Sequence, residues 1–179
     1  ATPQGIPSDF REISIDGDFS DWAGADVLDT DPAEAIDPDF NEVSVSNDAD
    51  FLYIRFTLHS PAAAFVDFTS HLFLDTDDNP GTGFTPGGTT FGSEMMIEGA
   101  TGYDQRGGGF NEGSVSSVAW SIANAATSEY EVRVSRAAIF DGDSQPVFDG
   151  DTIRLLLQNN AGDVTGSIRY QFAPNPPPP

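Results

Sequence analysis

Four oxygen-bearing side chains stand within five positions of one another in a single short stretch of the chain. They follow the apolar run 71–74, and they are Asp75, Asp77, Asp78 and Asn79. Gly81 and Gly83 come next and allow the backbone to fold back, so that carbonyl groups can also turn inward. Hard cations take about six to eight oxygen ligands, which short Asp-rich loops with glycine supply. The stretch 71–84 therefore predicts a calcium loop, with a solvated acidic turn as the alternative.

The loop differs from an EF-hand, because no Glu stands at the final position that the twelve-residue EF-hand loop requires. The neighbouring segment 25–39 is also acidic and is interrupted by proline. Its candidates for a second cation are Asp29, Asp31, Asp37 and Asp39. The preferred expectation for this segment is a solvated loop, with a second cation as the alternative.

The charge of the chain is strongly one-sided. Twenty-nine acidic residues oppose seven basic ones, all of them Arg, which gives a net charge of −22. Such a charge destabilises the compact state by self-repulsion unless cations screen or bind it. It excludes nucleic acid and anionic membranes as partners, because phosphate groups require a basic face. A high-salt habitat and specific calcium binding both predict this composition, and the sequence does not separate them.

Residue types and motifs exclude several kinds of chemistry. The chain has no cysteine, so disulfides, thiolate metal sites and a Cys nucleophile are all ruled out. No apolar run approaches the length that spans a bilayer. The motifs G-x-S-x-G, H-E-x-x-H and the P-loop do not occur. We therefore predict a protein that is not an enzyme and does not insert into a membrane.

An alternation of apolar and polar residues with a period of two dominates the chain from residue 40 onward. In the segment 51–58, Leu52, Ile54 and Phe56 share one face. The predicted strands are 12–16, 40–45, 51–58, 71–74, 93–98, 115–122, 129–134, 152–158 and 167–172. The segment 101–114 is predicted as a long loop and 136–140 as one helical turn. About nine or ten short strands between turns predict an all-β antiparallel sandwich of jelly-roll type.

At 179 residues the chain fits one domain, 12–172, flanked by an extended arm at 1–11 and a polyproline tail at 173–179. The start at Ala1 matches cleavage by a signal peptidase and predicts a secreted or cell-surface protein. An extended arm can add a strand to a neighbouring copy, with Ile6 and Phe10 as its apolar anchors. Contacts of this head-to-tail kind build filaments. Packing of the arm against its own domain is the alternative.

Four short pieces carry a resemblance to a known family: 15–22 (IDGDFSDW), 51–54 (FLYI), 73–77 (FLDTD) and 130–132 (YEV). Together they resemble the bacterial family 9 carbohydrate-binding modules and the related DOMON-like sandwiches, over about residues 12–160. The resemblance implies a β-sandwich with a structural calcium, to which Asp75, Asp77 and Asn79 map as ligands. It also implies that Glu94, which is distant in the sequence, is a further calcium ligand and that the side chain of Trp22 is buried and fills space in the core. It does not determine the function, since such sandwiches bind sugars, haem or partner proteins.

The haem and sugar functions of these sandwiches need specific side chains. Haem needs axial ligands, yet the candidates His59, His71, Met95 and Met96 are more typical of core filler and strand ends. Sugar binding needs exposed rings, and the candidates on glycine-rich loops are Phe84, Phe91, Tyr103 and Phe110.

We therefore predict a non-catalytic, secreted β-sandwich that calcium stabilises. The predicted role is that of a self-assembling filament or cell-surface subunit, with other copies of itself as partners. A polysaccharide-binding accessory module is the alternative.

Overall fold

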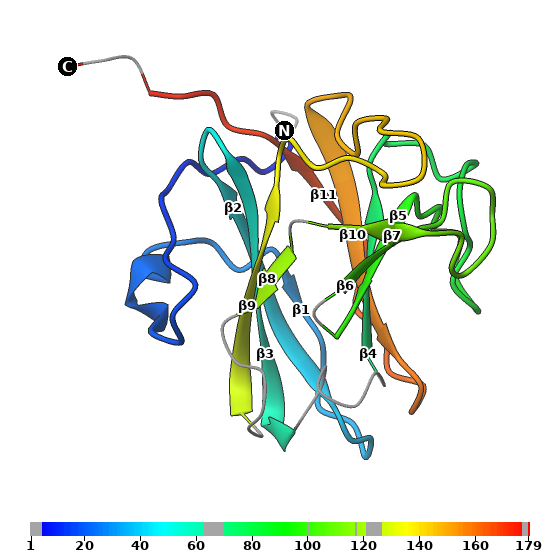
Figure 1. The fold of residues 1–179 in the computed structure, drawn as a ribbon. Coiled ribbons are helices and arrows are strands. Elements are labelled where there is room, and N and C mark those ends of the chain that lie inside the picture. The colour runs from blue at the N-terminus through cyan, green and yellow to red at the C-terminus, as the bar shows by residue number, and fades with distance from the viewer. Residues whose placement is uncertain (1–4, 63–69, 100, 117, 121–126, 177–178) are drawn as a thin grey trace.

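Two antiparallel sheets lie face to face in the computed structural model of the protein (Figure 1). The structure describes residues 5–62, 70–99, 101–116, 118–120, 127–176 and 179, with the backbone alone for 118–120. One sheet has five strands in the order β1 (Asp29–Thr30), β2 (Phe40–Asn47), β3 (Phe51–Ala62), β9 (Thr127–Ser135) and β8 (Val118–Trp120). Every pairing in this sheet is antiparallel.

The second sheet has six strands, and its pairings are also antiparallel. Their order is β11 (Ile168–Gln171), β10 (Thr152–Asn159), β4 (Ser70–Asp75), β5 (Met95–Glu98), β6 (Thr101–Asp104) and β7 (Ser114–Val115). The predicted all-β antiparallel sandwich is confirmed. No helix in the described part of the chain has both the length and the apolar character needed to cross a membrane.

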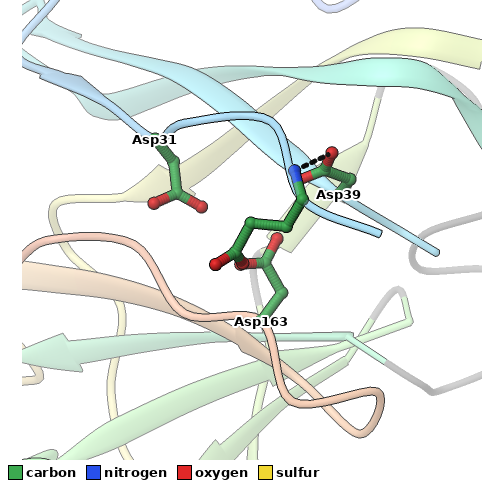
Figure 2. Close-up of side chains that lie close together, drawn as sticks. Asp31, Asp39 and Asp163 are labelled. Carbon is green, nitrogen blue, oxygen red and sulfur yellow. Dashed lines mark hydrogen bonds between the residues drawn. The ribbon is translucent and has the colours of Figure 1, made fainter. Parts of the chain in front are cut away.

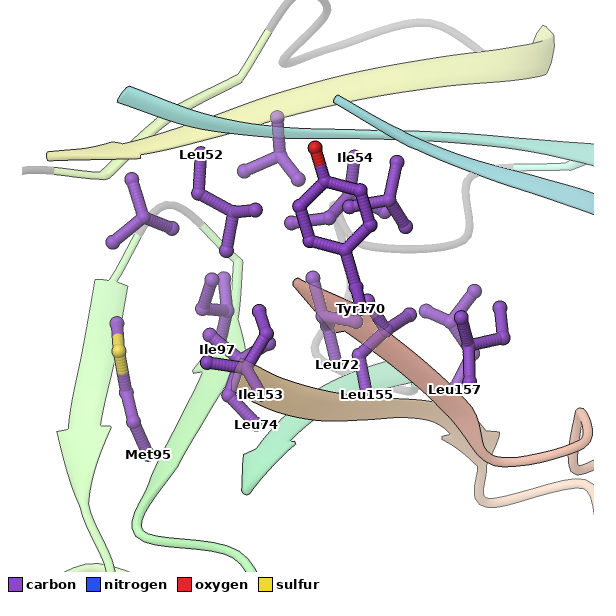
Figure 3. Close-up of a cluster of buried hydrophobic side chains, with 14 of the residues drawn as sticks. Leu52, Ile54, Leu72, Leu74, Met95, Ile97, Ile153, Leu155, Leu157 and Tyr170 are labelled. Atoms are coloured by element: carbon purple, nitrogen blue, oxygen red, sulfur yellow. The ribbon is translucent and has the colours of Figure 1, made fainter. Parts of the chain in front are cut away.

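The space between the sheets is filled by the alternating apolar residues of both layers (Figure 3). Leu52 and Ile54 of β3 are fully buried and face Leu72, Leu74 and Leu155 of the other sheet. Burial of such a side chain stabilises the fold by about 1.5–3 kcal/mol. This period-two pattern is why β3 was recognisable from the sequence.

Strand β4 is buried on both faces, which positions the loop that follows it. One face belongs to the main core, while Phe73 on the other face packs with Phe91, Met96 and Leu156. A strand that is covered on both faces typically has an uninterrupted run of apolar residues in its sequence. The end of β4 at Asp75 is consequently held by packing from both sides.

The predicted strand 12–16 is wrong. Its backbone donors bond to side chains instead of a neighbouring strand: the Ser14 amide donates to Asp21 Oδ2 (2.8 Å) and the Asp16 amide to Glu131 Oε1 (3.2 Å). Ile13 is still buried, in a small cluster with Trp22 and Tyr53 on the outer side of the five-stranded sheet. The alternation of apolar residues therefore predicted the burial of Ile13 correctly, although the segment 12–16 does not pair with a neighbouring strand.

Three other local predictions are also corrected. The segment 101–114 is not one long loop, because β6 and the start of β7 pair across it. The segment 136–140 forms a turn instead of a helical turn, closed by the Ala138 amide donating to Ser135 O (3.0 Å). The predicted strand 115–122 is divided between β7 and β8, and its residues 117, 121 and 122 lie outside the described residues.

The N-terminal arm docks on its own domain. The Asn47 amide donates to Asp9 O (3.0 Å), and the Arg11 amide donates to Asn47 O (3.0 Å). From the other sheet, the Gln171 amide donates to Pro7 O (2.9 Å). The arm therefore bridges β2 and β11, so that it closes one gap between the two sheets.

This docking matches the alternative expectation, packing of the arm against its own domain, and assembly through the arm stays a prediction. Ile6 and Phe10 are half-buried, and Phe10 forms a parallel bridge with Asn47 in the same chain. The tail begins in the same place, since the Ala173 amide donates to Asn47 Oδ1 (2.8 Å). Residues 174–176 beyond it are exposed, and 177–178 lie outside the described residues.

A buried carboxylate attaches the N-terminal segment to the five-stranded sheet. Glu131 of β9 is fully buried and accepts hydrogen bonds from Trp22 Nε1 (3.0 Å) and from the Gly17 and Asp16 amides. Trp22 is buried, as the resemblance implied. One acid of β9 thus receives three donors from a segment more than a hundred positions away.

We expect Glu131→Ala to lower the free energy of unfolding by about 2–3 kcal/mol, because buried donors lose their acceptor. Glu129→Ala is the matched control on the same strand, since Glu129 makes a half-exposed ion pair with Arg55. Pairs of that kind contribute about 0–1 kcal/mol. Urea unfolding of both variants measures the difference, and equal losses contradict the buried role of Glu131.

Candidate metal centre

Three carboxylates converge where β4 ends and β5 begins. Asp75 is the last residue of β4, Asp77 lies in the loop after it, and Glu94 immediately precedes β5. One oxygen of each lies within 4.8 Å of the others. We call Asp75, Asp77 and Glu94 the loop site. The pairing of β4 with β5 creates it, because the pairing returns Glu94 to the side of Asp75.

The loop site contains buried oxygens that no group satisfies. Asp75 is 0% exposed and Glu94 is 5% exposed. Among the described residues, Asp75 Oδ2 and Glu94 Oε1 have no hydrogen-bond partner. Leaving a buried polar group unsatisfied costs about 1–3 kcal/mol, and more for a charged one. Two such oxygens beside a third carboxylate require a compensating cation or proton.

Backbone amides and one hydroxyl orient the three acids. The Asn79 amide donates to Asp75 Oδ1 and to Asp77 Oδ1, both at 3.0 Å. Thr82 Oγ1 donates to Asp77 Oδ2 at 2.9 Å, while the Thr76 amide donates to Glu94 Oε2 at 2.9 Å. These bonds hold both oxygens of Asp77 but only one oxygen each of Asp75 and Glu94, whose remaining oxygens are left for another ligand.

The crowding of the carboxylates changes their acidity. Burial is the main cause that raises the pKa of Asp75 to about 6, and neighbouring Asp77 adds to it. Burial likewise raises the pKa of Glu94 to about 7, with Asp77 and Asp75 contributing. The site therefore favours either protons or a positive ion near neutral pH.

A solvent-accessible pocket of about 310 Å³ borders the loop site, lined in part by Thr76, Asp77, Thr82 and Glu94. Calcium takes about six to eight oxygen ligands and accepts water among them. Three carboxylates on one side and water on the pocket side match that requirement. Magnesium fits less well, because it requires near-ideal octahedral geometry at about 2.0–2.1 Å.

The structure does not bring Asp78 into the loop site. Asp78 adopts a left-handed backbone conformation (φ 55°) and accepts from Arg154 Nε (2.7 Å) and from Arg169 Nε (3.1 Å). Asn79 contributes its amide, while its side-chain Oδ1 accepts from the Gly81 amide (3.0 Å). Two of the five predicted ligands are therefore engaged elsewhere, and Asp75, Asp77 and Glu94 are brought together.

The predicted sugar-binding rings do not form an open platform. Phe91 is buried in the cluster on the outer face of the six-stranded sheet, and Phe84 and Tyr103 pack half-buried against that cluster. Phe110 alone of the four is well exposed, at 42%. Its ring meets Phe84 edge-on at 5.4 Å between centroids. The tight packing of these loops, which the glycine-rich sequence did not reveal, explains the difference.

The side chains considered as axial haem ligands either lie in the core or contact neighbouring polar groups. Met95 and Met96 are fully buried, on opposite faces of the six-stranded sheet. His71 Nε2 lies 2.7 Å from Glu98 Oε2. His59 Nε2 lies 2.9 Å from the carbonyl oxygen of Asp31.

A second acidic group exists that sequence reasoning identified only in part. Asp31 and Asp39 come from the predicted segment 25–39, but their companions are Glu34 and Asp163. The other two candidates lie elsewhere: Asp29 Oδ2 accepts from the Gly166 amide (3.1 Å), and Asp37 is exposed. Asp163 was missed because it is more than a hundred positions away, with no local pattern to mark it.

In comparisons with known proteins, no family model and no curated sequence matches this chain. The resemblance to family 9 carbohydrate-binding modules therefore stays a prediction.

The stability of the calcium-free protein should depend on pH because of the acids of the loop site. The folded-state pKa values near 6 and 7 lie above the ordinary 3.8 and 4.5 of these acids. The folded chain thus binds more protons than the unfolded chain between these values, and its free energy of unfolding falls as the pH rises. We expect chelated protein to melt at a lower temperature at about pH 8 than at about pH 5.

Glu94→Gln is the variant that checks this pH dependence, because the amide cannot titrate. It should melt with a shallower pH dependence than the parent chain over the same range. An unchanged slope contradicts the assignment to Glu94.

Proposed function

We propose that the protein is a non-catalytic β-sandwich whose folded state is stabilised by calcium at Asp75, Asp77 and Glu94, and that it works outside the cell. The observation that carries the proposal is the pair of buried carboxylate oxygens without a hydrogen-bond partner, on Asp75 and Glu94. Calcium satisfies both oxygens and neutralises part of a chain charge of −22. Calcium is abundant outside cells, and extracellular sites bind it with Kd values near about 10⁻⁴–10⁻³ M.

The location of the loop site supports a structural role. It lies at the end of a strand that is packed on both faces, and it connects that strand to the acid before β5. The chain has no disulfides to restrain this connection. A cation that binds the folded form alone shifts the folding equilibrium toward it.

A calorimetric calcium titration tests the proposal with two variants of one loop. Asp75→Asn removes a ligand charge and should weaken binding at this site by at least about tenfold. Asp78→Asn is the matched control, since Asp78 pairs with Arg154 and Arg169 instead of the loop site. It should retain calcium binding. Equal calcium affinity of Asp75→Asn and the parent chain contradicts the proposal.

Self-assembly through the arm is a second proposed function, supported by the kind of contact that the docked arm makes. The arm uses its own backbone groups to bond to the backbone of β2 and β11 and to the side chains of Ser46 and Tyr170, and an identical arm from a neighbouring copy can reproduce these bonds by exchange. Electron microscopy and sedimentation test it: polymers should form with the full chain and disappear when residues 1–11 are deleted. Polymers that survive the deletion contradict arm exchange.

A glycan-binding role has one supporting observation, the exposed ring of Phe110 next to Phe84. Affinity electrophoresis in polysaccharide gels, with Phe110→Ala as the variant, tests whether the exposed ring retards the protein. A single exposed ring offers less stacking area than the four that the sequence predicted, so we place this function behind the structural one.

A further inference from the structure

We propose a second calcium site, formed by Asp31, Glu34, Asp39 and Asp163, which ties the two sheets together at the end of the sandwich opposite the loop site. We call these four residues the cross-sheet site. It is independent of the proposed loop site, because the two share no residue.

The four acids come from two distant parts of the chain. Asp31, Glu34 and Asp39 belong to the connection from β1 to β2, in the five-stranded sheet, while Asp163 belongs to the connection from β10 to β11 in the other sheet. One carboxylate oxygen of each lies within 4.8 Å of the others. Figure 2 shows the carboxylates of Asp31 and Asp163 directed into the space between the two connections.

A buried oxygen without a partner points to a missing ligand. Asp39 is only 7% exposed, and its Oδ1 has no hydrogen-bond partner among the described residues. Its other oxygen accepts from the Glu34 amide at 2.9 Å, the bond drawn in Figure 2. Asp31 Oδ2 is likewise buried without a partner. A carboxylate left in this state is costly unless a cation or a proton completes it.

The backbone holds the cluster in place before any ligand binds. Asp163 is 1% exposed and accepts from the Phe40 amide (2.6 Å) and from the Val164 amide (2.9 Å). Asn159 joins the two connections, since its Nδ2 donates to Pro38 O (2.7 Å) and its Oδ1 accepts from the Asp163 amide (3.0 Å). These bonds fix Asp163 against the connection that carries Asp39, which lowers the ordering cost when a cation binds.

Positive charge is missing from the cross-sheet site. None of the ion pairs within the described ranges involves Asp31, Glu34, Asp39 or Asp163. Like charges within 4.8 Å of one another repel strongly when no positive group lies between them. Burial and neighbouring Asp163 accordingly raise the pKa of Asp31 to about 7. A divalent hard cation removes this repulsion and prefers carboxylate oxygens as ligands.

The two sites are far enough apart to act separately. Strand β10 pairs with β4 so that Arg154 faces Asp75 of the loop site, and Asn159 faces Ser70 at the other end. These five residue steps span about 17 Å. Effects of changes at such separations are additive. The loop site joins two neighbouring strands of one sheet, whereas the cross-sheet site joins the two sheets.

The test counts calcium ions per chain on the whole protein, by equilibrium dialysis followed by metal analysis. We expect two ions for the parent chain, one for Asp163→Asn, one for Asp75→Asn and none for the double variant. Asp37→Asn is the matched control, since Asp37 is an exposed acid of the same connection outside the cluster. It should bind two ions. Circular dichroism verifies that each variant is folded.

Asp31→Asn replaces Asp163→Asn if the latter does not fold, because Asp31 is only partly buried. A parent chain that binds one ion, lost in Asp75→Asn and kept in Asp163→Asn, overturns the cross-sheet site and leaves the loop site standing. An ion that is lost in Asp163→Asn and kept in Asp75→Asn supports the cross-sheet site and overturns the loop site. A parent chain without bound calcium overturns both, and protons then neutralise the acids.

Discussion

Removing calcium with a chelator is expected to lower the melting temperature of this protein by about 5–10 °C for each occupied site. The estimate takes calcium at about 100 times its Kd, where binding to the folded state alone adds about 2.7 kcal/mol to the free energy of unfolding. A domain of this size shifts by about 2–4 °C per kcal/mol. The physical source is the pair of buried oxygens of Asp75 and Glu94 without a hydrogen-bond partner, which the proposed calcium would satisfy.

Differential scanning calorimetry with and without chelator measures this shift. Asp75→Asn should show a smaller chelator effect than the parent chain, because one site no longer responds. Asp78→Asn should respond like the parent chain, since its carboxylate is paired with arginines. Excess magnesium should not restore the chelated protein. A melting curve that chelator leaves unchanged would falsify the calcium proposal.

The largest effect of a single substitution is expected for Gly83→Ala, with a loss of about 4 kcal/mol in the free energy of unfolding. Gly83 adopts φ +72°, a conformation that costs energy for a residue with a side chain. A Cβ here would lie 2.1 Å from Ser93 O and 2.7 Å from Glu94 Oε1. Ser93 O cannot easily retreat, because it accepts from the Phe84 amide (2.7 Å).

The same substitution should also weaken calcium binding, since the clash displaces Glu94 from Asp75 and Asp77. Gly87→Ala is the matched control in the same loop, because its Cβ meets no atom within 4 Å and its φ is not positive. Denaturant unfolding and calcium titration of both variants provide the comparison. Similar behaviour of Gly83→Ala and Gly87→Ala is the outcome that would contradict the close packing of the loop.

Much of the loop site could be predicted from the sequence, because most of its residues are close together in the chain. Asp75 and Asp77 are two positions apart at the end of an apolar run, and glycines follow at fixed offsets. Glu94 was placed beside them by the resemblance, and the pairing of β4 with β5 brings it there. Asp78 shows the limit of the local pattern. Its left-handed backbone turns its carboxylate toward Arg154 and Arg169, both remote in the sequence.

The aromatic residues show the same limit. Phe91 and Phe110 both stand in glycine-rich stretches and are indistinguishable by their neighbours in the chain. Their exposures differ because Phe91 packs with Phe73 and Met96 on the outer face of the six-stranded sheet, while the ring of Phe110 lies edge-on against Phe84. Which ring is buried depends on how the loops fold over the sheet.

The sequence by itself determined the all-β sandwich, the strong acidity and the position of the main acidic loop. These properties depend on alternation, composition and spacing, which are carried by neighbouring residues. Only the tertiary structure decided that the arm docks on its own domain and that Asp163 joins Asp31 and Asp39. Those outcomes depend on which strands pair and which distant groups then meet, and no local pattern encodes them. Both acidic groups lie where two separate segments meet, and these are the two places where we propose that calcium binds.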